Sequence, residues 1–113
     1  MYISQALELA DQSIDSLIAS LEGLSIEELH TLVKDLRFIN RLDIFTACHG
    51  FLLKKAQRFL NSMKELENHA LDDYGLDELR DHILEKTGFK IDSKTLPAQG
   101  VEKLLDEIAR LRR

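Results

Sequence analysis

The sequence contains few residues that interrupt helices or carry redox chemistry. It has one proline, five glycines, no tryptophan and a single cysteine, Cys48, in 113 residues. Scarce proline and glycine disfavour a fold of many short strands joined by turns. One thiol excludes an intramolecular disulfide and a zinc site built on several cysteines. The remaining composition is rich in Leu, Ile, Ala, Glu and Lys, which are mostly good helix formers, so we expect an all-α protein.

Long apolar runs and a basic start are also missing. No stretch approaches the roughly 20 apolar residues needed to cross a bilayer. Residues 1–10 carry Glu8 and no Lys or Arg, so they lack the positive segment of a signal peptide. The composition, 44% hydrophobic and 31% charged, is that of a folded chain rather than a disordered one. We expect a single helical domain over residues 1–113, located in the cytoplasm, with no membrane contact.

Basic residues are absent from the first part of the chain. Residues 1–31 contain six acidic residues and no Lys or Arg, whereas residues 32–64 contain seven basic and two acidic ones. The formal net charge of the whole chain is −5, which disfavours non-specific binding to nucleic acid or to anionic membranes. An acidic segment followed by a basic one indicates that the two lie side by side.

Apolar residues recur with the spacing of packed helices. In residues 2–23 they stand three and four positions apart, which is the heptad pattern of a coiled-coil-type helix. They are Ile3, Leu7, Ala10, Ile14, Leu17 and Leu21, followed by Leu24. Ser25 and Glu28 then have the spacing of a capping box, which marks a helix start. The sequence predicts a helix over residues 2–23, a short turn and a second helix from residue 26.

A second heptad seam runs over residues 38–70. Its members that we expect to form a contact surface are Phe38, Leu42, Phe45, His49, Leu52, Phe59, Met63 and Leu66. The seam is out of register with the apolar stripe before it, and such a shift overwinds or breaks a helix. We therefore expect a break or kink near residues 40–43, with Asn40 or Asp43 as the cap of a new helix. The alternative is one continuous helix over residues 26–71.

The C-terminal part of the sequence predicts a pair of helices. Residues 72–75 have the composition of a turn, Asp77 can cap a following helix, and Gly88 can end it. Residues 89–99 are irregular, and a last helix is expected from about Gly100.

The predicted architecture is thus a helical hairpin or bundle with coiled-coil-like packing and four to five helices. A long helical hairpin covers residues 1–71, and the C-terminal helical pair covers residues 76–113.

Metal and catalytic patterns are weak. Glu27 and His30 have the Glu-x-x-His spacing of di-metal helical bundles, but no second pair with that spacing occurs. Adjacent helical residues diverge by about 100° around the axis, so Cys48 and His49 do not converge on one atom. We expect no catalytic residue, no cofactor and no metal. His49 is interpreted as a polar residue that fixes helix register. Gly50 is interpreted as a site of close packing, with a hinge as the alternative.

The basic residues permit two interpretations. Those that could contact DNA phosphates are Lys34, Arg37, Arg41, Lys54, Lys55 and Arg58. The favoured interpretation pairs them with acidic residues of the first helix, because it accounts for both charge blocks. Those acidic residues are Glu8, Asp11, Asp15 and Glu22.

The length of the second seam indicates a partner. Residues 38–70 span about 50 Å if helical, whereas a helix over residues 2–23 spans only about 33 Å. We expect a non-enzymatic protein–protein interaction module, a regulatory or adaptor protein that self-associates through its heptad-patterned helices and presents a helical groove. The simplest partner is a second copy in a twofold dimer, and another helical protein is the next candidate. The alternative function is a DNA-binding regulator, either transcriptional or of plasmid or phage type, that uses the basic residues 34–58 or the C-terminal helical pair.

Overall fold

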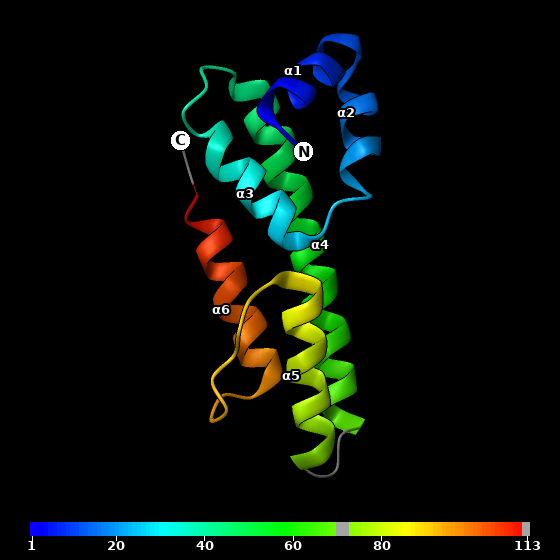
Figure 1. Cartoon of the computed structure of the whole chain (residues 1–113), viewed down its shortest axis with the longest axis vertical. Coiled ribbons are helices and arrows are strands. Elements are labelled where there is room, and N and C mark those ends of the chain that lie inside the picture. Colours follow the sequence, from blue (N-terminus) through cyan, green and yellow to red (C-terminus); the bar gives the residue numbers. More distant parts are fainter. Residues whose placement is uncertain (70–72, 112–113) are drawn as a thin grey trace.

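The computed structural model describes residues 1–69 and 73–111, which form six α-helices (Figure 1). The all-α prediction is confirmed, and the predicted number of four to five helices is wrong. In chain order the helices are α1 (Ile3–Gln12), α2 (Ile14–Leu21), α3 (Ile26–Leu36), α4 (Leu42–His69), α5 (Asp73–Thr87) and α6 (Pro97–Ala109). No helix within the described ranges is both long enough and apolar enough to span a membrane.

The additional helix arises because the predicted first helix is divided at Ser13. This residue has extended backbone angles, φ −171° and ψ 154°, and its N–H donates to the carbonyl of Leu9. Its hydroxyl oxygen accepts a hydrogen bond from the N–H of Ser16 at 3.0 Å, which is the N-cap arrangement of α2. Ser13 therefore ends one helix and starts the next, although the apolar heptad spacing continues across it.

The predicted capping box at the start of α3 is confirmed. Ser25 Oγ accepts from the N–H of Glu28 at 3.1 Å, and the Glu28 carboxylate accepts from the N–H of Ser25 at 3.3 Å. Hydrogen bonds from the Ser25 backbone and side chain lower the pKa of the Glu28 carboxyl. The reciprocal bonds satisfy two of the free N–H groups at the helix start.

The predicted break between the second helix and the seam is also confirmed, because residues 37–41 separate α3 from α4. The predicted caps are wrong: α4 begins at Leu42, so Arg41 is the residue that precedes it. The Arg41 carbonyl accepts from the N–H of Phe45 at 3.1 Å, and its guanidinium binds Asp43 at 3.1 Å. Asp43 instead lies in the first turn, where the helix dipole favours a carboxylate.

Helix α4 is the axis of a molecule that measures 50 × 23 × 18 Å (Figure 1). Around its first half, α1, α2 and α3 form an upper apolar cluster. Leu104 and Ile108 in the second half of α6, and Leu111 just after its end, complete this cluster. Along its second half, Leu60 and Met63 form a lower cluster with residues of α5 and α6. Phe59, Phe89 and Leu105 pack against both clusters. The core is therefore two joined clusters along one long helix.

The C-terminal helices begin earlier than predicted. Helix α5 starts at Asp73, so residues 73–75 of the predicted turn are helical. Asp77, the predicted cap, lies inside the helix. Asp72 is outside the described residues. Gly88 ends α5 as predicted, with φ 73° and its N–H donating to the carbonyl of Leu84 at 2.8 Å. Only glycine adopts this left-handed conformation without strain.

Helix α6 starts at Pro97 rather than near Gly100, and its start is capped by another helix. Proline suits the first helical position because its missing N–H has no partner there anyway. The next N–H, that of Ala98, donates to the Glu67 carboxylate of α4 at 2.8 Å. This cap joins residues 31 positions apart, so no local sequence pattern predicts it.

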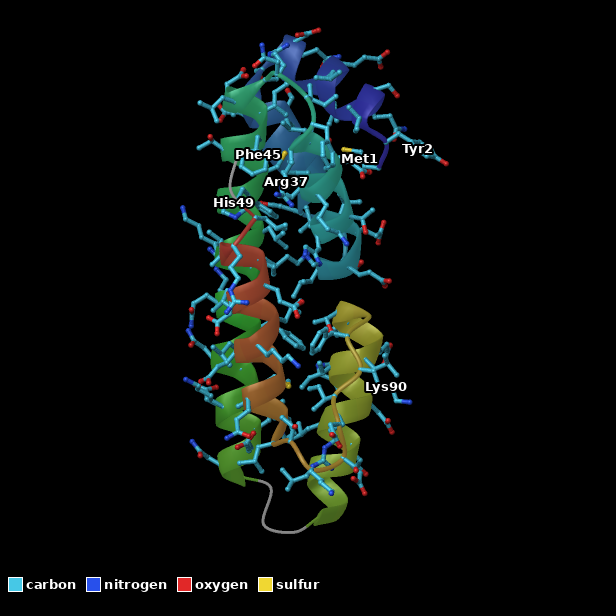
Figure 2. All side chains as sticks on the ribbon, turned by 90° about the vertical axis from the view of Figure 1, so that its left-hand side faces the viewer. Met1, Tyr2, Arg37, Phe45, His49 and Lys90 are labelled. Atoms are coloured by element: carbon cyan, nitrogen blue, oxygen red, sulfur yellow. The ribbon has the colours of Figure 1, made fainter. Side chains whose placement is uncertain are left out.

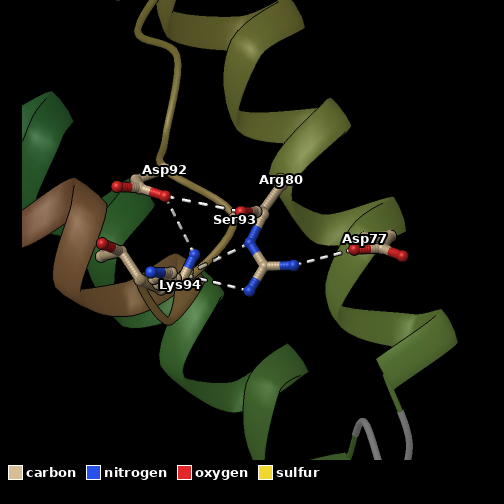
Figure 3. A network of polar contacts seen from close by, with 6 residues as sticks. Asp77, Arg80, Asp92, Ser93 and Lys94 are labelled. Carbon is tan, nitrogen blue, oxygen red and sulfur yellow. Dashed lines mark hydrogen bonds and ion pairs between the residues drawn. The ribbon is translucent and has the colours of Figure 1, made fainter.

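The connection between α5 and α6 is held by Arg80 (Figure 3). Its Nε and Nη2 donate to the Thr95 carbonyl at 3.2 and 3.1 Å, and its Nη1 binds Asp77 at 2.8 Å. Asp92 accepts from the N–H of Lys94 at 3.1 Å within the same connection. One half-buried guanidinium thus fixes an otherwise irregular segment against α5.

The interpretation of Gly50 as a site of close packing is wrong. A Cβ atom added at Gly50 would meet no atom within 4 Å, so nothing requires a glycine in this turn of α4. We expect Gly50→Ala to raise the free energy of unfolding by about 0.5–1 kcal/mol, because alanine loses less conformational freedom in a helix. The urea midpoint measures this change.

Gly100→Ala is the matched control, because a Cβ there would collide with the side chain of Ile91. We expect this variant to lower the urea midpoint. A stabilised Gly100→Ala variant, or a destabilised Gly50→Ala variant, would contradict the described packing.

Candidate functional site

The eight seam residues predicted to form a contact surface divide into three groups. The groups are buried (Phe45, Leu52 and Met63), half-buried (His49 and Phe59) and exposed (Phe38, Leu42 and Leu66). The buried members lie in the two clusters of the chain's own core. The argument that one short helix cannot cover the seam does not hold, since α5 and α6 pack along its second half. The exposed members are fully available to a partner, and the half-buried Phe59 offers part of its ring.

His49 is a contact within the chain. Its Nε2 lies 2.8 Å from the carbonyl oxygen of Ile108, which can only accept, so the ring nitrogen donates. The ring stacks on Phe45 with centroids 5.4 Å apart, and it lies beside the C-terminal end of α6 (Figure 2). The neighbouring Cys48 is buried, and burial raises the pKa of its thiol to about 11. The pair therefore supplies helix packing and a protonated, unreactive thiol.

The first candidate surface is the corner between α3 and α4. Phe38 is 85% exposed and Leu42 is 61% exposed. Both have basic residues near them in the chain. One of these, Arg41, binds Asp43, and its Nη1 lies 3.8 Å from Oδ1 of Asp11 in α1. We call this surface the α3–α4 corner and define it by Lys34, Arg37, Phe38, Arg41 and Leu42. A large aromatic ring held almost wholly in water is unusual and suggests a contact site.

The second candidate surface is a groove lined by the middle of α4, the α2–α3 turn and the end of α5. The ribbon in Figure 1 shows where these three segments lie. Its main hollow has a volume of about 560 Å³, and a second of about 240 Å³ shares Glu22, Lys55 and Arg58 with it. The α4 side of this basic groove is lined by Phe51, Lys54, Lys55, Arg58, Phe59 and Ser62. Facing them are residues 22–26, Glu85 and Lys86.

The basic residues predicted from the sequence are split between these two surfaces. Lys34, Arg37 and Arg41 belong to the corner, and the other three line the groove. Lys55 is already engaged, because its ammonium donates to the carbonyls of Glu22 and Leu24 after the end of α2. The sequence analysis missed Lys86, which comes from a distant helix and reaches the groove only through folding.

The predicted pairing between the acidic and basic blocks is largely wrong. Within residues 1–69 and 73–111, the ion pair that joins the two blocks is Asp11–Arg41, and both side chains are substantially exposed. An exposed pair at 3.8 Å contributes little stability. Most charges of both blocks therefore stay in water, where they remain available to a partner.

The Glu27 and His30 pattern does not build a metal site. In the described part of the chain, no three His, Cys, Asp or Glu side chains lie close enough together to hold a metal ion. The Glu27 carboxylate lies against Gly88 at the end of α5. Burial, followed by the nearby Lys34, lowers the pKa of His30.

Comparison of the chain with protein-family models, with curated proteins and with solved structures finds no match. The two surfaces therefore carry the functional argument alone.

Proposed function

We propose that this protein is a non-enzymatic interaction module that self-associates, most simply as a twofold dimer, and serves as a regulatory or adaptor protein. The single observation that carries the proposal is the exposure of Phe38 and Leu42 at the α3–α4 corner. They are the first two positions of the heptad seam, whereas Phe45 and Leu52, further along the seam, are buried in the core. A cytosolic location with a reduced Cys48 is part of the proposal.

The charges around the corner suit a contact of the surface with itself. A twofold interface brings the same patch of two copies together, so it needs groups of both signs within one patch. Lys34 and Arg37 are exposed cations at the end of α3, and Asp11 approaches the corner through Arg41. Two exposed apolar side chains close in the chain to charges of both signs have the composition of a protein interface.

The test is sedimentation equilibrium of the wild type and of the double variant Phe38→Ser/Leu42→Ser. We expect a concentration-dependent dimer for the wild type. We expect the double variant to dissociate about 100-fold more readily or further, because each copy loses apolar area worth about 1.5–3 kcal/mol per side chain.

Leu84→Ser is the matched control, because Leu84 is an exposed leucine, at 44%, on α5 and away from the corner. We expect it to leave the dimer unchanged. A wild type that stays monomeric at millimolar concentration would refute self-association. A double variant that dimerises like the wild type would refute the corner as its site.

A further inference from the structure

We propose that the basic groove binds an acidic amphipathic helix of a partner protein. The proposal deepens the interaction function by naming the chemistry of a second partner. It uses none of the corner residues, so either proposal can fail without the other.

The first step is the shape of the groove. Lys55, Arg58, Phe59 and Ser62 follow the three-and-four spacing of one helix face, and the second hollow extends this face back to Phe51. From Phe51 to Ser62 the face is about 16 Å long, which is about three helical turns. A hollow that is open on the surface along this face of α4 suits a second helix laid beside it.

The second step is the charge of the groove. Lys54, Arg58 and Lys86 make no ion pair or side-chain hydrogen bond with the described residues, although Glu22 and Glu85 line the same surface. With Lys55, four basic groups face two acidic ones in a chain whose net charge is −5. A locally positive hollow on a negative molecule attracts anions in preference to cations.

The third step is the apolar floor. Phe51 and Phe59 are half-buried, and Leu24 of the opposite wall is half-buried as well. The Phe59 ring is held by stacking on His82, with centroids 5.8 Å apart. A partner that binds here must offer apolar side chains to the floor and carboxylates to the rim, which is the pattern of an acidic amphipathic helix.

The same features disfavour a nucleic acid as the occupant. A phosphate backbone presents negative charge at every step, and it would pass Glu22 and Glu85 as well as the cations. A phosphate backbone also offers no apolar side chain for Phe51 and Phe59.

The experiment uses the full-length protein, labelled with 15N, and a synthetic 18-residue peptide of leucine, alanine and glutamate with leucines at heptad spacing. We expect saturable chemical-shift changes in residues 22–26 and 54–62.

Charge reversal by Arg58→Glu/Lys86→Glu should weaken binding by about tenfold or more, because both charges then repel the peptide. Lys103→Glu is the matched control: it changes an exposed lysine of α6 outside the groove, and binding should change less than about twofold.

Four results of the binding experiment would overturn the proposal. They are the absence of saturable binding, shifts confined to other residues, equal affinity in the Arg58→Glu/Lys86→Glu variant, and tighter binding of a random 18-base-pair DNA duplex. Sedimentation of the same variant provides a further test. A loss of the wild-type dimer in this variant would mean that a second copy occupies the groove, which also contradicts the proposal.

Discussion

Replacing Phe45 with aspartate is expected to unfold the protein. The Phe45 side chain is 4% exposed, lies in the upper cluster and stacks on His49. The variant loses the buried ring and places a carboxylate inside the apolar upper cluster, at a cost of about 3–5 kcal/mol or more. Small domains are stable by only about 5–15 kcal/mol, so most or all of the stability is lost. Circular dichroism during thermal unfolding measures the change.

Phe38→Asp is the control for this prediction, since it introduces the same charge at another aromatic position of the seam. Phe38 is 85% exposed, so we expect the free energy of unfolding of the monomer to change by no more than about 0.5 kcal/mol. The two variants separate the part of the seam that builds the core from the part left for a partner. A folded Phe45→Asp variant with an unchanged midpoint would show that the described core is wrong.

Replacing Ile83 with alanine is expected to destabilise the lower cluster more than the upper one. Ile83 is fully buried on α5, and its truncation leaves a cavity that costs about 2–5 kcal/mol. Among the residues that the structure describes, those that pack against both clusters are Phe59, Phe89 and Leu105. We therefore expect the lower half to open on its own in this variant, as a local unfolding unit.

Native-state hydrogen exchange measures this difference. Amide protons of α5 should exchange faster in Ile83→Ala while those of α3 keep their protection. Leu29→Ala is the matched control, because Leu29 is fully buried in the upper cluster. In Leu29→Ala, amide protons of α3 should exchange faster while those of α5 keep their protection. A uniform rise in exchange over all helices in both variants would show that the clusters unfold as one unit.

Much of the fold could be predicted because heptad spacing and caps are local signals. Ser25 and Glu28 are three residues apart and mark the start of α3, and the change of register near Leu42 marks the start of α4. The break at Ser13 could not be predicted from periodicity, because a single extended residue leaves the apolar spacing intact on both sides. The start of α6 depends on Glu67, a residue of another helix.

The candidate site could be predicted only in part. Lys54, Lys55 and Arg58 stand out as a basic cluster in the sequence, but their separate roles depend on the fold. Lys55 holds the α2–α3 turn, whereas Arg58 lines the groove with Lys86 from the end of α5. The exposure of Phe38 could not be predicted either, because heptad position alone does not show which stretch of a seam the chain itself covers.

The position of α6 bears on how the chain folds during synthesis. Ala98 and Val101 complete the lower cluster, and Leu104, Ile108 and Leu111 complete the upper one. Neither half of the molecule therefore has its full set of apolar contacts until α6 has left the ribosome. Until then, part of the apolar surface of the preceding helices stays exposed to solvent. Transiently exposed apolar surfaces of this kind are those that chaperones bind.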